Sequence, residues 1–113
     1  MTTASKRNSV AKKIGERDFD ASETHSAVSY YRMAYWSWGV SKKEMHNGNC
    51  LLYKVSGRLH KGWVAVTLSW KDLYDVHLID RHGEITETVS DIFVDHLNEI
   101  MDNLIETPLT PKK

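Results

Sequence analysis

The chain has 113 residues, 41% of them hydrophobic, and its 15 Lys and Arg balance its 15 Asp and Glu to a formal net charge of zero. This length can bury one modest core, so we expect one domain. Cys50 is the single cysteine, which excludes an intramolecular disulfide and a cysteine-based zinc site, and its thiol is expected to be reduced and half-buried. Without an apolar run of about 18 residues or the apolar stretch of a signal peptide, the sequence predicts a cytoplasmic protein with no membrane contact.

Both ends of the chain are predicted to be unstructured tails. Residues 1–19 place five Lys and Arg among small polar residues, with Val10 and Ile14 as their apolar pair at helical spacing. Such a segment buries too little to offset its ordering entropy, so we predict a basic disordered tail, with a short basic helix that orders on a partner as the alternative. Residues 108–113 form the second tail because their two prolines block a helix. The single folded domain is placed at residues 20–107.

The first helix is predicted to begin near Asp20, where the residues up to Glu23 have capping-box spacing, and to end before Gly39. It carries large side chains on nearly every side. Either these aromatics fill the core beneath a sheet, or those that do not fit, such as Tyr30 and Trp36, form a partner-binding face. The capping-box spacing recurs at residues 41–44, which predicts a short second helix ending at Gly48.

Residues 50–79 show a period of two, which predicts three antiparallel strands with one buried face. The loop of the second hairpin is predicted at Lys71 to Leu73. The register that buries both apolar sets pairs Val66 with Leu78, Leu68 with Val76, Trp70 with Tyr74, Tyr53 with Val66 and Leu51 with Leu68. A turn at residues 80–83 leaves room for a short fourth strand around Ile85.

Apolar residues at three- and four-residue steps predict a C-terminal amphipathic helix capped by Thr88 or Ser90. Its outer face carries Asp91, Asp95, Glu99, Asp102 and Glu106 without one Lys or Arg. The predicted core places Val64, Val66, Leu68, Val76, Leu78 and Tyr53 under Ile92 or Phe93, Leu97, Ile100 and Leu104. The fold class is therefore α+β, with an N-terminal helix, a short helix, a three- or four-stranded antiparallel meander and a C-terminal helix packed on the sheet.

The other face of the predicted sheet mixes apolar and polar side chains. Leu52, Trp63, Ala65, Leu73 and Ile79 interleave there with Lys54, Thr67, Asp75 and His77. This face is too apolar for open solvent and too polar for a core. We expect it to be partly covered, either by the N-terminal segment or by a second copy of the chain, which would make a homodimer.

Residues that could perform chemistry are sparse. The six histidines have no H-x-x-x-H or H-E-x-x-H spacing, so no metal site is predicted. Asp75 and His77 share one side of a strand, as a general base and its orienting residue would, but no nucleophile motif or phosphate-binding loop stands nearby. We predict neither an enzyme nor a cofactor.

The charges are distributed unevenly along the chain, although they sum to zero. Residues 1–71 hold 12 Lys and Arg against 5 Asp and Glu, a difference of +7, and residues 72–113 hold 3 against 10, a difference of −7. The basic half contains Arg58, Lys61 and Trp63 close together, with His60 between them, which could bind single-stranded nucleic acid by stacking and phosphate contact. An ordinary hairpin loop is the alternative for these residues.

Several short segments resemble a loose group of small uncharacterised proteins encoded by bacteriophages and related mobile elements. The resemblance covers residues 28–105 and rests on Tyr30-Tyr31, Tyr35-Trp36, Gly39-Val40, Asn49 to Val55, Gly62-Trp63-Val64 and Asp72 to Val76. It implies an accessory protein made inside a bacterial host cell, of a kind that often acts by binding a host or defence protein.

The leading functional prediction is a protein-interaction module that binds and modulates such a protein. The candidate partner-binding residues are Asp91, Asp95, Glu99, Asp102, Glu106, Tyr30, Trp36 and Trp63. An exposed aromatic or acidic patch, in place of a deep cleft, would favour this prediction. The alternative is nucleic-acid binding through the basic N-terminal half, which requires Lys and Arg to converge on one surface and predicts a steep dependence on salt.

Overall fold

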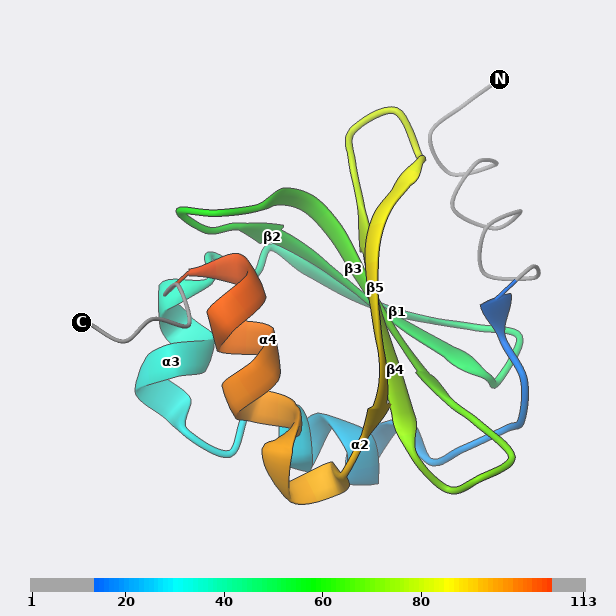
Figure 1. Ribbon diagram of the computed structural model, residues 1–113. Coiled ribbons are helices and arrows are strands. Elements are labelled where there is room, and N and C mark those ends of the chain that lie inside the picture. The colour runs from blue at the N-terminus through cyan, green and yellow to red at the C-terminus, as the bar shows by residue number, and fades with distance from the viewer. Residues whose placement is uncertain (1–13, 107–113) are drawn as a thin grey trace.

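The computed structural model describes residues 14–106, which form an α+β fold built on one five-stranded antiparallel sheet (Figure 1). In chain order the elements are α2 (Ala21–Val28), α3 (Arg32–Ser37), β1 (Lys42–His46), β2 (Cys50–Ser56), β3 (Lys61–Leu68), β4 (Tyr74–Ile79), β5 (Ile85–Ile92), the 3₁₀ helix η1 (Val94–His96) and α4 (Leu97–Ile105). The strands follow one another as a meander, and the helices pack against one face, which we call the first face. The predicted fold class is confirmed, with more strands than expected.

The register of the central strands differs from the prediction by two residues. Val66 lies opposite Val76 and Leu51, whereas the sequence pattern predicts Leu78 and Tyr53 there. Side chains in a strand alternate between faces, so a shift of two keeps every side chain on its predicted face. Between β3 and β4 the shift arises because the loop extends from Ser69 to Leu73 and is closed by a hydrogen bond from the Ser69 N–H to the Leu73 carbonyl. Between β2 and β3 it accompanies a turn at residues 57–60, which is closed by a hydrogen bond from the Gly57 N–H to the His60 carbonyl.

Residues 42–46 form the edge strand β1, so the prediction of a short helix there was wrong. The reason is the Asn47-Gly48 pair, whose φ angles of 57° and 72° are both positive. Two such residues make a tight hairpin turn, and the turn pairs the preceding segment with β2. The capping-box spacing at residues 41–44 is overridden by this turn.

The predicted long first helix is broken into α2 and α3. The Asp20 carboxylate caps α2 as expected, accepting a hydrogen bond from the Glu23 N–H at 3.1 Å. Ser29 ends α2, and its hydroxyl donates to the carbonyl of His25. The break allows Val28 and Trp38 both to be buried against the first face.

The predicted C-terminal helix begins later than expected, because residues 85–92 pair with β4 as strand β5. Asp91 therefore lies in a strand and Asp95 in η1, while Glu99 and Asp102 lie in α4 and Glu106 caps its end. The five carboxylates predicted along one helix face are distributed over three elements.

The core on the first face agrees with the predicted one at most positions. Its buried residues are Val28, Trp38, Leu51, Tyr53, Val55, Val64, Val66, Leu68, Tyr74, Val76, Leu78, Ile92, Leu97, Met101 and Ile105. Ile100 and Leu104 are half-buried against this core, and Met101 and Ile105 take the fully buried positions of α4. Phe93 is exposed, so of the predicted alternatives Ile92 is the core residue.

The opposite side of the sheet, the second face, carries a smaller buried cluster of Cys50, Leu52, Trp63, Ala65 and Ile79. Ile14 packs against this cluster, and Arg17 forms a bridge to Leu68. Residues 14–19 thus contact the sheet, and the fold begins before the predicted boundary at residue 20. The remainder of the two predicted tails, residues 1–13 and 108–113, lies outside the described residues.

Candidate functional site

A hollow of about 480 Å³ opens where the end of α2 meets η1. It is lined by Ala27, Tyr30, Val94 and Asp95, so its wall is apolar with one carboxylate at the edge. The buried Asn98 amide donates a hydrogen bond to the Val28 carbonyl at 2.6 Å and thereby ties α4 to the last turn of α2. We call this concavity the α2–η1 hollow.

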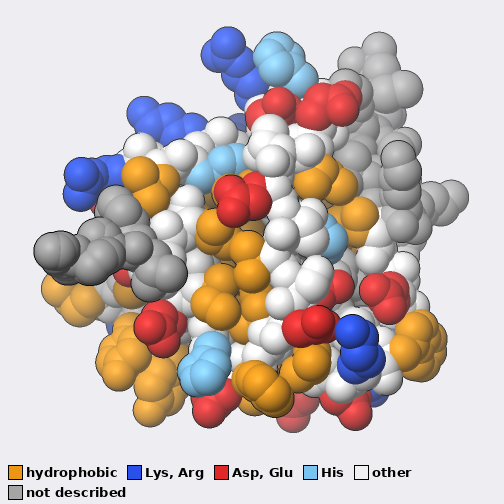
Figure 2. Space-filling view, in the orientation of Figure 1, with side chains coloured by type: hydrophobic (Ala, Val, Ile, Leu, Met, Phe, Trp, Pro, Cys, Tyr) orange, Lys and Arg blue, Asp and Glu red, His pale blue; other side chains and the backbone are white. Residues whose placement is uncertain are grey.

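Tyr30 lines the α2–η1 hollow, and further exposed aromatic side chains follow in the chain and on α3. Tyr30 is 74% exposed and Trp36 66% exposed. Tyr31, Met33 and Phe93 are exposed as well, and the rings of Tyr30 and Tyr31 meet edge to face at 5.2 Å. Figure 2 shows hydrophobic side chains gathered at the lower left, where α3 lies, with acidic side chains beside them. Contiguous exposed apolar surface of this kind commonly marks an interaction site.

The five predicted acidic residues divide into two groups. Asp95 lines the α2–η1 hollow, and Glu99 lines a neighbouring concavity on α4 with His96, Ile100 and Asn103. Both carboxylates are exposed. They are the members of the predicted set that the structure brings to the aromatic surface.

Each of the remaining three carboxylates accepts a hydrogen bond from, or forms an ion pair with, another part of the fold. Asp102 accepts a hydrogen bond from the indole N–H of the buried Trp38 at 2.8 Å. Glu106 accepts one from the Arg58 N–H at 3.0 Å. Asp91 forms an ion pair with the Lys71 ammonium at 3.1 Å. These contacts hold loops and helices in place, so the prediction of a single acidic face was wrong.

Two aromatic predictions have opposite outcomes. Tyr30 and Trp36 are exposed on the surface where a partner could reach them, but Trp63 is only 4% exposed and lies in the second-face cluster. The sequence analysis missed Val94 as a wall of the hollow. The sequence carries no signal for its exposure, because two adjacent apolar residues of a helix can both lie in its buried stripe.

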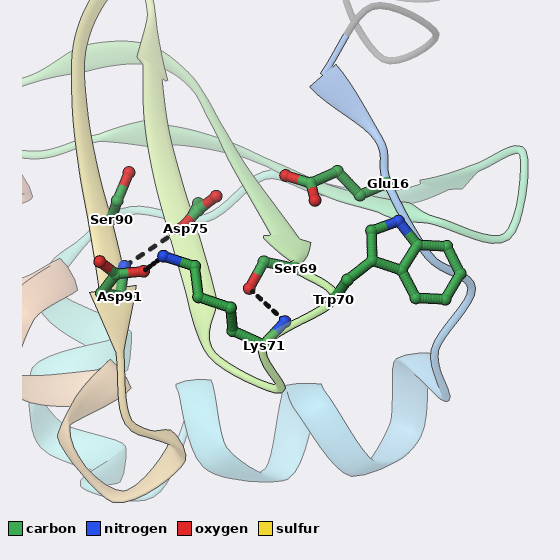
Figure 3. A pocket seen from close by; sticks show the side chains of 7 residues that line it. All are labelled: Glu16, Ser69, Trp70, Lys71, Asp75, Ser90 and Asp91. Carbon is green, nitrogen blue, oxygen red and sulfur yellow. Dashed lines mark hydrogen bonds and ion pairs between the residues drawn. The ribbon is translucent and has the colours of Figure 1, made fainter.

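A polar hollow of about 270 Å³ lies beside β5 and is lined by Glu16, Ser69, Trp70, Lys71, Asp75, Ser90 and Asp91 (Figure 3). A bulge in β5 forms it, with Asp91 at a positive φ of 59° and its N–H donating to the Asp75 carboxylate at 3.1 Å. Figure 3 shows Lys71 directed toward Asp91 and away from Trp70. The ion pair between Lys71 and Asp91 holds the bulge. The sequence pattern predicts Trp70 in the strand pairing, but its side chain is 73% exposed in the loop.

Among the described residues, the hydrogen bonds of the His77 ring go to threonine hydroxyls and not to Asp75. His77 is buried, and its two ring nitrogens hydrogen-bond with the hydroxyls of Thr67 and Thr88 at 3.2 and 3.1 Å. Burial lowers its pKa, against smaller opposing effects of Asp75 and Glu16. Both nitrogens are thus engaged in cross-strand contacts. Over residues 14–106, no three His, Cys, Asp or Glu side chains come together as a group that could hold a metal ion.

The proposed nucleic-acid surface around Arg58 lacks its stacking groups. His60 is buried, with its Nε2 atom 3.1 Å from the Trp63 carbonyl, and Trp63 lies on the second face. The segment is a hairpin loop whose Leu59 and His60 N–H groups donate to the Ile105 carbonyl.

In the part of the chain described, no helix has the length and apolar character needed to cross a membrane. Comparisons with protein-family models, with curated proteins and with solved structures find no match to this chain.

Proposed function

We propose that this protein is an interaction module that binds a partner protein through the α2–η1 hollow and the exposed aromatics beside it. The observation that carries the proposal is an apolar concavity of about 480 Å³ whose wall includes the exposed side chains of Tyr30 and Val94. Interfaces are anchored by apolar side chains inserted into such concavities, with aromatic residues contributing much of the binding energy.

The charge around the hollow indicates the chemistry of the partner. Residues 93–106 contain four carboxylates and no Lys or Arg, and Asp95 and Glu99 are the exposed ones next to the hollow. A basic segment with one large apolar side chain would complement this surface, because its cations would face Asp95 and Glu99 while the apolar group fills the hollow. We therefore propose a basic amphipathic segment of a host or defence protein as the ligand.

A direct test uses a fluorescently labelled amphipathic helical peptide of Leu and Lys, with a matched peptide of Leu and Glu as its control. Fluorescence anisotropy should show binding of the Leu/Lys peptide, weakening as salt rises, and much weaker binding of the Leu/Glu peptide. Equal binding of the two peptides would contradict the proposed charge complementarity.

Variants of the protein locate the site. Tyr30→Ala should weaken the Leu/Lys peptide at least tenfold, whereas Trp70→Ala removes an equally exposed aromatic elsewhere and should leave binding unchanged. The double reversal Asp95→Lys with Glu99→Lys should abolish binding, with Glu87→Lys on β5 as the charge control. If the double reversal has no effect while Trp36→Ala abolishes binding, the interface lies on α3 and not at the hollow.

Capture of partners from a bacterial lysate, with and without nuclease, separates this function from the nucleic-acid alternative. Proteins retained by the parent chain, resistant to nuclease and lost with Tyr30→Ala, are expected. Capture that disappears with nuclease would favour nucleic-acid binding.

A further inference from the structure

The short helix α3 exposes large apolar side chains on one side. Within the described chain, α3 contains no fully buried residue, and it rests on the first-face core through the half-buried Tyr35. Met33 and Trp36 are 78% and 66% exposed. They stand three residues apart and therefore project from the same side of the helix. Because a helix of six residues is too short to be stable by itself, contact of this side with a second surface would stabilise it.

The exposed side of α3 has the chemistry that the proposed function requires of a ligand for the α2–η1 hollow. Such a ligand carries a cation and one large apolar side chain. Arg32 is exposed at the start of α3, and Trp36 stands four residues later, on the same side of the helix. Arg32 is also the single Lys or Arg between residues 18 and 41. The helix α3 thus presents one cation beside a large ring.

We propose that α3 of a second copy of the chain occupies the α2–η1 hollow, so that two copies form a symmetric dimer that competes with the partner protein. This inference rests on the proposed function, because it concerns the same hollow. Tyr30 lines the hollow and Arg32 begins α3 two residues later, so the inserted helix and the receiving hollow are neighbours on each copy. A two-fold axis sets the same surface of both copies face to face, and each α3 then meets the hollow of the other copy.

Charge complementarity favours a second copy as the occupant. Asp95 lines the hollow and Glu99 lines the neighbouring concavity, and both carboxylates are exposed. In the two-fold arrangement the Arg32 guanidinium of each copy faces these carboxylates of the other copy. The same attraction therefore acts twice, and it fixes the orientation of the two copies.

The exposed apolar area corresponds to a weak dimer. Tyr30, Tyr31 and Trp36 are each about two-thirds exposed or more, and Met33 lies among them in the chain. Since an aromatic side chain can bury about 150–250 Å², each copy offers about 500 Å² through these four residues. Two copies would bury about 1,000 Å², which is near the lower limit for a specific interface. We therefore expect a dimer that dissociates on dilution and so leaves the hollow open to a partner.

Sedimentation velocity of the full-length chain over a range of concentrations tests the dimer. The average mass of the parent should rise from that of one copy toward that of two. Arg32→Glu should raise the dissociation constant at least tenfold, and so should the double reversal Asp95→Lys with Glu99→Lys, because like charges then meet in both contacts. Glu87→Lys on β5 should leave the dissociation constant unchanged.

A mixture of the two charge variants identifies the contact. In a heterodimer of Arg32→Glu with the double reversal of Asp95 and Glu99, opposite charges face each other in both contacts, so mixing should restore the dimer. Misfolding of either variant would not be repaired by mixing. Arg81→Glu, in the β4–β5 turn, changes the net charge as Arg32→Glu does and should restore no dimer when it is mixed with the double reversal.

The outcomes separate this inference from the proposed function. A parent that stays monomeric at every concentration while it binds the Leu/Lys peptide would overturn the dimer and leave the proposed function in place. Charge variants that stay monomeric when mixed would show that α3 does not meet the hollow, and species larger than a dimer would contradict the two-fold arrangement. A dimer restored by mixing, in a chain that does not bind the Leu/Lys peptide when dilute, would support the dimer and contradict the proposed function.

Discussion

The two faces of the sheet are covered in different ways. On the first face, α2, α3 and α4 bury a continuous apolar cluster that includes Trp38, Val66 and Leu97. On the second face a smaller cluster is interrupted by buried polar groups, in which His77 joins Thr67 and Thr88 across three strands. Alternating apolar residues in a strand indicate that one face of the sheet is covered. They do not indicate which element covers it, because that element is distant in the sequence.

The largest effect is expected from a cavity in the first face. Leu97→Ala removes a fully buried side chain between α4 and the sheet and should lower the free energy of unfolding by about 2–5 kcal/mol. Urea denaturation measures this loss. Met33→Ala, at an exposed position, should change the stability by less than about 0.5 kcal/mol. A Leu97→Ala variant as stable as Met33→Ala would contradict the helix-on-sheet packing.

A matched cavity in the second face sharpens the comparison. Ile79 is as fully buried as Leu97, so Ile79→Ala should cost about 2–4 kcal/mol if that face is a covered core. We expect a value at the lower end, because the smaller cluster can relax more easily around the cavity. A loss below about 1 kcal/mol would indicate that the second face is open to water in solution.

The sequence predicted which side chains share a face but not how the strands pair. Period two assigns Val64, Val76 and Leu78 to one side under any register that differs by an even number of residues. The register itself depends on the length of the β3–β4 loop, where Asp72 adopts a positive φ of 64°. Nothing in the local pattern distinguishes a loop of three residues from the observed loop of five.

The candidate site was predicted only in part. Exposure of Tyr30 and Trp36 follows from a helix too rich in aromatics to bury them all. The α2–η1 hollow could not be predicted, because it forms where Ala27 and Tyr30 meet Val94, more than sixty residues later in the chain. The apolar period of residues 89–105 also suits a helix throughout, and only pairing with β4 makes its first part a strand.

A pH dependence distinguishes the two faces further, since the second face contains a buried histidine. Desolvation lowers the pKa of His77 below its usual 6.5, and the pKa of His25 is lowered in the same way by burial and by Lys43. The unfolded chain therefore binds protons that the folded chain does not, so the free energy of unfolding should fall as the pH decreases below 6.5.

His77→Gln tests the contribution of the second face to this slope. Between pH 7 and pH 5.5, the free energy of unfolding of this variant should fall less than that of the parent, as measured by urea denaturation at each pH. His25→Gln measures the contribution of the other histidine to the same pH dependence. The effect should be smaller than that of either cavity, because the imidazole keeps its two hydrogen bonds in the folded chain and the substitution leaves the apolar packing in place. Parallel pH profiles of His77→Gln and the parent would contradict a buried neutral imidazole.

The smallest effect on stability is expected at the proposed binding surface. Asp95 and Glu99 are exposed, and their reversal to Lys acts on the fold in two opposing ways. Positive charge at the first turn of α4 opposes the helix dipole, whereas at position 99 it attracts the carboxylate of Asp102 three residues later in the same helix. The double variant should therefore unfold within about 0.5 kcal/mol of the parent, as surface substitutions usually do. If the double variant keeps its stability but no longer binds the peptide, these carboxylates act in recognition. If its free energy of unfolding falls by more than about 1 kcal/mol, they support the fold, because exposed charges contribute little to stability unless they are paired in a network.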